Sequence, residues 1–286
     1  MDGSGTPRFQ PPPQPGASPY VPSPYAAAAA LGPGPGARRP VRVLDGVRFA
    51  FTNPNWKNDL LLSIVLSLIP LVGPLAFAGW LVEVHQRLVR RHPSPFPKLD
   101  FGDLMYWVNR GLAPFLVGLV VGLPVFFLVY LAIAIGMGIT VAIGAATGEP
   151  IVVVLVSVVM ALAWALFLLA VGPVYNAFQT RAELTGTFEG AFRFSDSMAY
   201  ARATAWRVIV KNLVFGMVAT GLVLCGMLAC YVGLFPAIVV VQIAAMHLRW
   251  QLYDDHRARG GAEIPLQEPQ PVPAEQALAG GGAPRA

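Results

Sequence analysis

Three long stretches of the chain carry almost no charged residue, and polar segments rich in arginine separate them. Residues 60–82 and 212–248 contain no Asp, Glu, Lys or Arg, and residues 111–180 contain only Glu149. A helix needs about 20 apolar residues to cross the hydrocarbon core of a bilayer. The pattern therefore predicts an integral membrane protein whose middle consists of helices that cross or enter the bilayer.

Gly and Pro divide the two longer stretches into four predicted spans, with turns at 146–150 and 231–235. A straight helix over residues 111–145 would be about 53 Å long at 1.5 Å per residue. We therefore expect Pro114 and Pro124 to kink it. The predicted spans are 111–145, 151–172, 208–230 and 236–250.

The first stretch allows two interpretations. Residues 60–69 are followed by a Pro/Gly break at 70–74 and then by residues 75–88. Ten apolar residues are too few to cross a bilayer alone. The stretch is either one kinked span or a hairpin that enters the membrane and returns.

Orientation favours the hairpin, because segments rich in Lys and Arg beside spans stay in the cytoplasm. Both flanks of the first stretch are basic, whereas the turns at 146–150 and 231–235 contain no Lys or Arg. The sequence predicts an all-α, polytopic transmembrane helix bundle of three hairpins, with five to six membrane segments and both termini cytoplasmic. The alternative is five spans with the N-terminus outside. The deciding residues are Arg38, Arg39, Arg42, Arg48, Lys57, Arg87, Arg90, Arg91, Lys98, Arg110, Arg181, Arg193, Arg202, Arg207, Lys211, Arg249, Arg257 and Arg259.

Composition agrees with a membrane protein that has polar tails. The chain is 55% hydrophobic and 12% charged, whereas soluble domains carry about 25% charged residues. We expect a disordered Pro/Gly/Ala-rich tail over 1–41, a multi-pass transmembrane domain over 42–253 and a disordered tail over 254–286. The first tail is expected to be a spacer, with binding of Pro-recognition domains as the alternative. Four tryptophans fall at the predicted cytoplasmic boundaries, where aromatic belts form: Trp56, Trp107, Trp206 and Trp250.

Several motifs of the first half occur in a recognisable order. They resemble a family of bacterial and archaeal multi-pass membrane proteins catalogued only as a domain of unknown function, over roughly residues 47–253. Asn53 and Trp80 depart from the Asp and Tyr usual in that family, and Phe96 and Lys98 stand near where its P-x-W is expected. The resemblance implies a fold and a membrane location but no activity. The motifs are FAFTNPNW at 49–56, IPLVGP at 69–74, AGWL at 78–81, PFPKLDFGDL at 95–104, RGL at 110–112, AELTGTF at 182–188 and AFRF at 191–194.

Few residues offer chemistry. Glu83 and Arg87 are spaced for an i,i+4 ion pair, and with His85 they are expected to form the charged interfacial end of a helix. Asn176 and Gln242 are expected to hydrogen-bond across helices, or else to line a path. The chain contains no P-loop, dinucleotide-binding fingerprint, HExxH, CxxC or nucleophile elbow. The sequence thus predicts no catalytic, cofactor-binding or metal site and no cofactor.

Residues 188–206 combine aromatic residues at helical spacing with nearby arginines. This segment is expected to be a helix lying on anionic lipid, with an ordinary polar connection as the alternative. The expected partners are the bilayer and other membrane proteins or further copies of the chain, and no nucleic acid. The first hypothesis for function is a non-enzymatic scaffold or accessory protein of the cytoplasmic membrane. The alternative is a transporter or channel-like protein for a neutral or lipidic substrate, gated by Pro-broken helices.

Overall fold

The computed structural model describes residues 40–229 and 232–275, and within these ranges every regular element is a helix. The all-helical prediction is therefore confirmed for the described chain. The elements are α2 (Val43–Phe49), α3 (Trp56–Ser67), α4 (Val72–Val89), η1 (Phe101–Asp103), α5 (Leu104–Thr147), α6 (Pro150–Thr185), α7 (Phe188–Ala191), α8 (Phe194–Leu228) and α9 (Leu234–Ala258).

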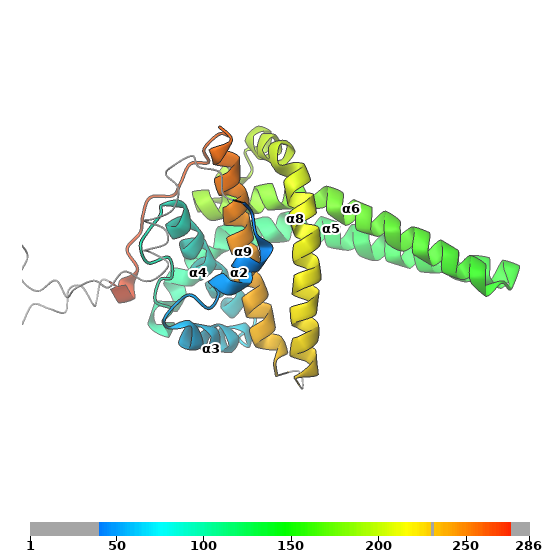
Figure 1. Ribbon diagram of the computed structural model, residues 1–286, viewed down its shortest axis with the longest axis horizontal. Helices are drawn as coiled ribbons and strands as arrows, with labels where there is room; N and C mark the ends of the chain where they lie inside the picture. Colours follow the sequence, from blue (N-terminus) through cyan, green and yellow to red (C-terminus); the bar gives the residue numbers. More distant parts are fainter. Residues whose placement is uncertain (1–39, 230–231, 276–286) are drawn as a thin grey trace, which may run out of the picture.

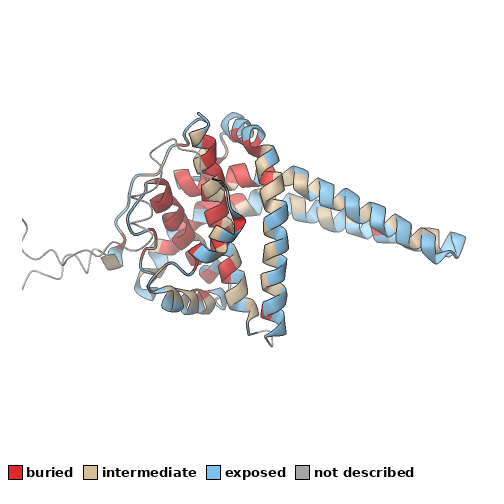
Figure 2. Ribbon diagram, viewed as in Figure 1, coloured by how far each residue is buried: buried red, intermediate tan, exposed pale blue. Residues whose placement is uncertain are grey.

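The helices form a base from which two pairs of long helices diverge. In Figure 1, α5 and α6 leave the base together as a long arm along the horizontal axis, while α8 and α9 run across that axis. Figure 2 shows buried residues concentrated in the base, around α4 and α9, and mostly exposed residues along the arm. Because the exposed parts are apolar, the two pairs present a surface suited to lipid rather than water.

Four helices are long and apolar enough to cross a membrane: α5 with η1, α6, α8 and α9. The prediction of several membrane-spanning helices is supported to that extent. α3 has 12 residues and measures about 18 Å at 1.5 Å per residue, short of a hydrocarbon core of about 30 Å. α4 is buried along most of its length within the base. Length and hydropathy thus support four of the five to six predicted segments.

The first uncharged stretch forms two helices rather than one. α3 ends at Ser67 and α4 begins at Val72, and Leu71 between them has a left-handed backbone with φ of 63°. A Cβ atom at Gly73 would overlap the carbonyl oxygen of Leu66. Glycine at this position therefore allows α4 to pass close to the end of α3. Because the helix is interrupted at Leu71, the stretch is not one continuous kinked helix.

The polar connection between the predicted spans 151–172 and 208–230 is largely helical. α6 continues to Thr185, where Gly186 ends it with a φ of 65°, and α8 begins at Phe194. The charged residues of the connection therefore lie mostly on helices. Pro114 and Pro124 lie inside α5, and Pro173 lies inside α6, so these helices continue through their prolines.

Residues 254–275 are ordered, which contradicts the prediction of a disordered tail for this part of the chain. α9 continues to Ala258, and we call residues 259–275 the C-terminal strap. Ile264 and Val272 of the strap are buried, and the backbone N–H of Gln267 donates to the carbonyl of Leu184 over 2.8 Å. These contacts offset the ordering of a Pro-rich segment. The rest of that predicted tail, and residues 1–39 of the other, lie outside the described residues.

The tryptophans do not form the predicted belt. Trp107 and Trp250 are buried, Trp56 is half-buried and only Trp206 of the four is exposed. Trp80 is also buried, and its indole N–H donates to the carbonyl of Pro97 over 3.0 Å. Large aromatic side chains in the base therefore serve as its core rather than as membrane-boundary anchors.

Candidate functional site

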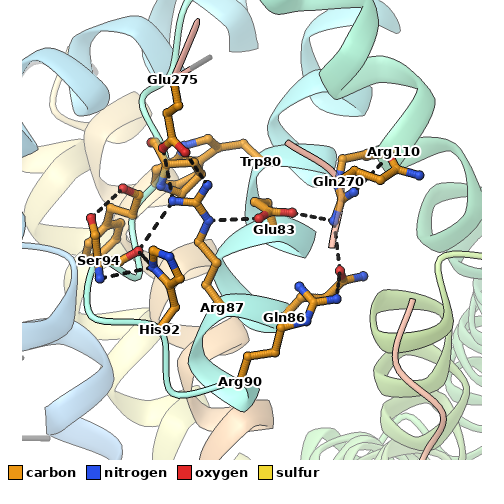
Figure 3. A network of polar contacts seen from close by, with 12 residues as sticks. Trp80, Glu83, Gln86, Arg87, Arg90, His92, Ser94, Arg110, Gln270 and Glu275 are labelled. Carbon is orange, nitrogen blue, oxygen red and sulfur yellow. Dashed lines mark hydrogen bonds and ion pairs between the residues drawn. The ribbon is translucent and has the colours of Figure 1, made fainter. Parts of the chain in front are cut away.

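Two glutamates, Glu83 on α4 and Glu183 on α6, are buried in the base. Each lies within ion-pair distance of two basic side chains, at least one of which belongs to another helix. Buried carboxylates are costly unless paired, so these two groups are the most informative polar features of the described chain. Figure 3 shows the part of this network around Glu83.

Glu83 joins α4 to α5. Its Oε1 accepts a hydrogen bond from Nε of Arg87, one turn later on α4, over 2.8 Å. Its Oε2 pairs with the guanidinium of Arg110 on α5, which is itself buried. The predicted i,i+4 pair is confirmed, and the pair is extended across helices by a residue that the sequence indicated only as part of a basic flank.

Gln86 connects the two glutamates. It is fully buried, and its Oε1 accepts a hydrogen bond from Arg110 over 2.8 Å. Its Nε2 donates to the backbone carbonyl of Glu183 over 2.8 Å. A single amide side chain therefore links the Glu83 ion pairs on α4 and α5 to the backbone of α6.

Glu183 joins α6 to α4 and α9. Its carboxylate lies 2.6 Å from Nδ1 of His85 on α4, and it accepts hydrogen bonds from Nη2 and Nε of Arg249 over 2.7 and 3.2 Å. The sequence predicts His85 at the charged interfacial end of a helix, whereas its side chain is fully buried in the base. His85 Nε2 has no hydrogen-bond partner among the described residues.

The C-terminal strap closes over the Glu83 side of the network. Glu275 accepts two hydrogen bonds from Arg87, over 3.0 and 2.7 Å, and Gln270 accepts one from Arg110 over 3.2 Å. Burial alone would lower the pKa of Arg87, but the bonds to Glu275 and Glu83 outweigh it and raise that pKa. Arg87 therefore remains charged, and Figure 3 shows both arginines tied to the strap.

This arrangement stabilises one relative position of four helices and the strap. We call Glu83, Gln86, Arg87, Arg110, Glu183 and Arg249 the buried ion network. Removing one partner of a buried ion pair costs about 3–5 kcal/mol, because a charge is left buried without compensation. The network therefore penalises any separation of α4, α5, α6 and α9 within the base.

The neutral polar residues do not make the predicted contacts between helices. Asn176 is buried on α6, and its Oδ1 accepts a hydrogen bond from Thr180, one turn later on the same helix. Gln242 is exposed on α9, and no hydrogen bond to its side chain is found in the described part of the chain. The prediction of bonds across helices is wrong for Asn176.

The segment 188–206 is divided rather than a single helix. The short helix α7 ends at Ala191, and α8 begins at Phe194. Aromatic and basic side chains of this segment are exposed together, and this combination is typical of a membrane-facing surface. The predicted contact with lipid therefore stays a prediction. The exposed aromatic and basic residues are Phe188, Arg193, Phe194, Arg202 and Trp206, and the acidic Glu189 and Asp196 are exposed as well.

Comparison with known proteins gives a family and no activity. No curated protein and no solved structure matches the chain. A family model described as "Protein of unknown function (DUF4013)" matches residues 62–247, which include α4, α5, α6, α7, α8 and both buried glutamates. The resemblance inferred from the sequence is thereby confirmed, and the chain belongs to the DUF4013 family.

Proposed function

We propose that this protein is a non-enzymatic scaffold or accessory protein of the cytoplasmic membrane. Its apolar helices enter the bilayer, with the α5–α6 arm and the α8–α9 pair turned closer to parallel than in Figure 1, and its base presents a surface to partner proteins on the cytoplasmic side. The proposal combines the apolar pairs, the base held by the buried ion network and the absence of recognised catalytic motifs from the sequence.

The observation that carries the proposal is the exposure of the apolar helices. In the most apolar 18-residue stretch of α6 no residue is buried, and in those of α5 and α8 only 6% are buried. Side chains arranged in this way contact lipid or a partner helix. A transport path needs several helices around a common axis, whereas the arm consists of α5 and α6 alone.

The continuity of the helices also favours a scaffold over a gated transporter. Discontinuous helices commonly form the substrate sites of transporters. α5 runs unbroken through Pro114 and Pro124, and α6 runs unbroken through Pro173. These three prolines therefore do not interrupt their helices, whereas Pro70 lies in the break between α3 and α4.

The proposed orientation places the base in the cytoplasm and the connections after α5 and α8 outside. It rests on the positive-inside rule, since residues 146–150 carry no Lys or Arg whereas the base carries most of the basic residues. The three-hairpin topology, with α3 and α4 as a pair that returns to the cytoplasmic side, is part of this proposal.

Reconstitution in liposomes separates the scaffold from the transporter. We expect the full-length protein to give no solute flux above empty liposomes and to co-purify from its native membrane with a partner at a fixed ratio. Flux that Gln242→Leu abolishes would contradict the scaffold, because Gln242 is an exposed polar residue of α9. The matched control is Ile238→Ala, which changes an exposed apolar residue one turn earlier on the same helix.

A further inference from the structure

A pocket lies where α6, α8 and α9 meet. Its volume is about 210 Å³, and in Figure 1 α8 crosses α6 in this region. Its lining combines apolar and polar side chains. The lining residues are Gly172, Tyr175, Asn176, Asn212, Phe215, Ala245, Leu248 and Arg249.

The pocket lies at the boundary between apolar and charged sequence on all three helices. On α8, Asn212 directly follows Lys211, the last charged residue before an uncharged run to residue 248. On α9, Arg249 ends that run. On α6, Asn176 is the first amide side chain after the apolar residues 151–172. If the helix pairs enter a bilayer as proposed, this level is that of the lipid headgroups.

The polar atoms facing this region include hydrogen-bond donors without partners among the described residues. Arg249 uses Nε and Nη2 for Glu183, which leaves its Nη1 available. Asn176 uses only its Oδ1, so its amide N–H groups are available. The Asn212 amide nitrogen lies 3.7 Å from the position that a Cβ at Gly172 would occupy, and no hydrogen bond to it is found within the described residues.

This chemistry selects a ligand with acceptor oxygens and an apolar body. Three of the lining residues carry donor groups, namely Asn176, Asn212 and Arg249, and the charge of Arg249 is balanced by Glu183. Phe215 and Leu248 form the apolar wall. Guanidinium and amide donors suit phosphate oxygens, and apolar walls suit acyl chains.

We propose that the pocket between α6, α8 and α9 binds the phosphate group of a phospholipid, whose chains lie along the exposed apolar faces of α6 and α8. The lipid fills the fork between the two diverging helix pairs. This inference rests on the membrane insertion of the proposed function, but it does not depend on whether the protein is a scaffold or a transporter.

The test is native mass spectrometry of the full-length protein in detergent, titrated with dioleoyl-phosphatidylglycerol. The variant Asn212→Asp keeps the side-chain shape and replaces a donor by an anion. We expect it to bind at least about tenfold more weakly, since one bond to a charged group is lost. The matched control Asn58→Asp changes an exposed residue of α3 and should bind as the unchanged protein does.

Two further ligands identify the source of the phosphate group. Dioleoylglycerol lacks the phosphate, and inorganic phosphate lacks the chains, so both should bind at least about tenfold more weakly than the phospholipid. Equal binding of either one, or unchanged binding by Asn212→Asp with an unchanged thermal unfolding curve, would overturn the proposal. If Asn212→Asp unfolds, Phe215→Ser replaces it in the titration. This variant removes part of the apolar wall and should also bind the phospholipid more weakly. Solute flux in liposomes would contradict the scaffold without altering these affinities.

Discussion

Gly79 on α4 lies directly against Gly111 on α5 where the two helices cross. A Cβ at Gly79 would lie 2.8 Å from the backbone nitrogen of Gly111, and a Cβ at Gly111 would lie 2.7 Å from that of Gly79. Each would also overlap a backbone carbonyl oxygen, that of Trp107 or of Leu75. This close crossing brings α4 and α5 near enough for the ion pair between Glu83 and Arg110.

Substitution at this crossing should therefore destabilise the base. Gly79→Ala or Gly111→Ala forces the helices apart, and we expect a loss of about 1–3 kcal/mol in the free energy of unfolding, as for other overpacked cores. Gly122→Ala is the control, since apart from the adjoining turns of α5 itself no described atom lies within 4 Å of a Cβ there. Thermal unfolding in detergent measures both. Equal stability of Gly79→Ala and Gly122→Ala would show that the helices do not cross as described.

Loss of the Glu183 carboxylate should be more damaging than loss of an exposed one. Glu183→Gln leaves the Arg249 guanidinium without its counter-charge in the base, which predicts a cost of about 3–5 kcal/mol. Asp254→Asn breaks the more exposed pair with Arg91, for which about 0–1 kcal/mol is expected. Chemical denaturation of the two variants provides the comparison, and similar losses would contradict a buried ion network.

The C-terminal strap should loosen when its ion pair with α4 is removed. Glu275→Gln removes the counter-charge that Arg87 has on the strap, and because Glu275 is partly exposed we expect only about 1 kcal/mol of local stability to be lost. Hydrogen exchange over residues 259–275 should quicken, while α4 itself should change little. Glu268→Gln, at an exposed position of the same strap, should leave the exchange unchanged. Faster exchange in both variants would mean that the total negative charge of the strap, rather than the ion pair between Glu275 and Arg87, holds it in place.

Asp59 should make the protein less stable as pH rises. Burial raises the pKa of Asp59 from 3.8 to about 6, although a hydrogen bond from Asn53 lowers it. Between those values the folded chain binds more protons at this carboxyl than the unfolded chain, so stability falls with increasing pH across that window. Asp59→Asn should remove this fall and raise the melting temperature at pH 7 but not at pH 3. If the stability of Asp59→Asn still falls with increasing pH as before, another group must cause that fall.

Asp100 should have the opposite effect and make the protein less stable as pH falls. A backbone hydrogen bond from Gly102, together with Lys98, holds the pKa of Asp100 below its usual value of 3.8. The ionised Asp100 therefore contributes to the free energy of unfolding at neutral pH, and this contribution is lost as pH falls through that lowered pKa. Asp100→Asn should lower the melting temperature at pH 7, and a rise there would contradict the assignment.

The sequence predicts the long apolar helices better than the helices that are buried in the base. The uncharged runs identify α5, α6, α8 and α9, the four helices that are long and apolar enough to cross a membrane. The first half of α4 is equally free of charge, yet it is buried mostly in protein. Burial in a core and exposure to lipid leave the same pattern, so composition alone does not distinguish α4 from a spanning helix.

The buried ion network could not be assembled from the sequence alone. His85 and Glu183 are 98 residues apart, and no local spacing relates them. Only the i,i+4 pair of Glu83 and Arg87 has a local signal. The strap is missed for a similar reason: its Pro-rich composition resembles a disordered tail, whereas its order depends on Ile264 and Val272 reaching a distant core.

The most direct test of membrane insertion with a cytoplasmic base is labelling of single cysteines in intact cells. Cys225 and Cys230 are first replaced by alanine, and one cysteine is then introduced at Gly148, between α5 and α6, or at Pro95, between α4 and η1. An impermeant thiol reagent added outside should label the cysteine at residue 148 and should label that at residue 95 only after the membrane is permeabilised. Labelling of residue 95 but not residue 148 in intact cells would contradict the account.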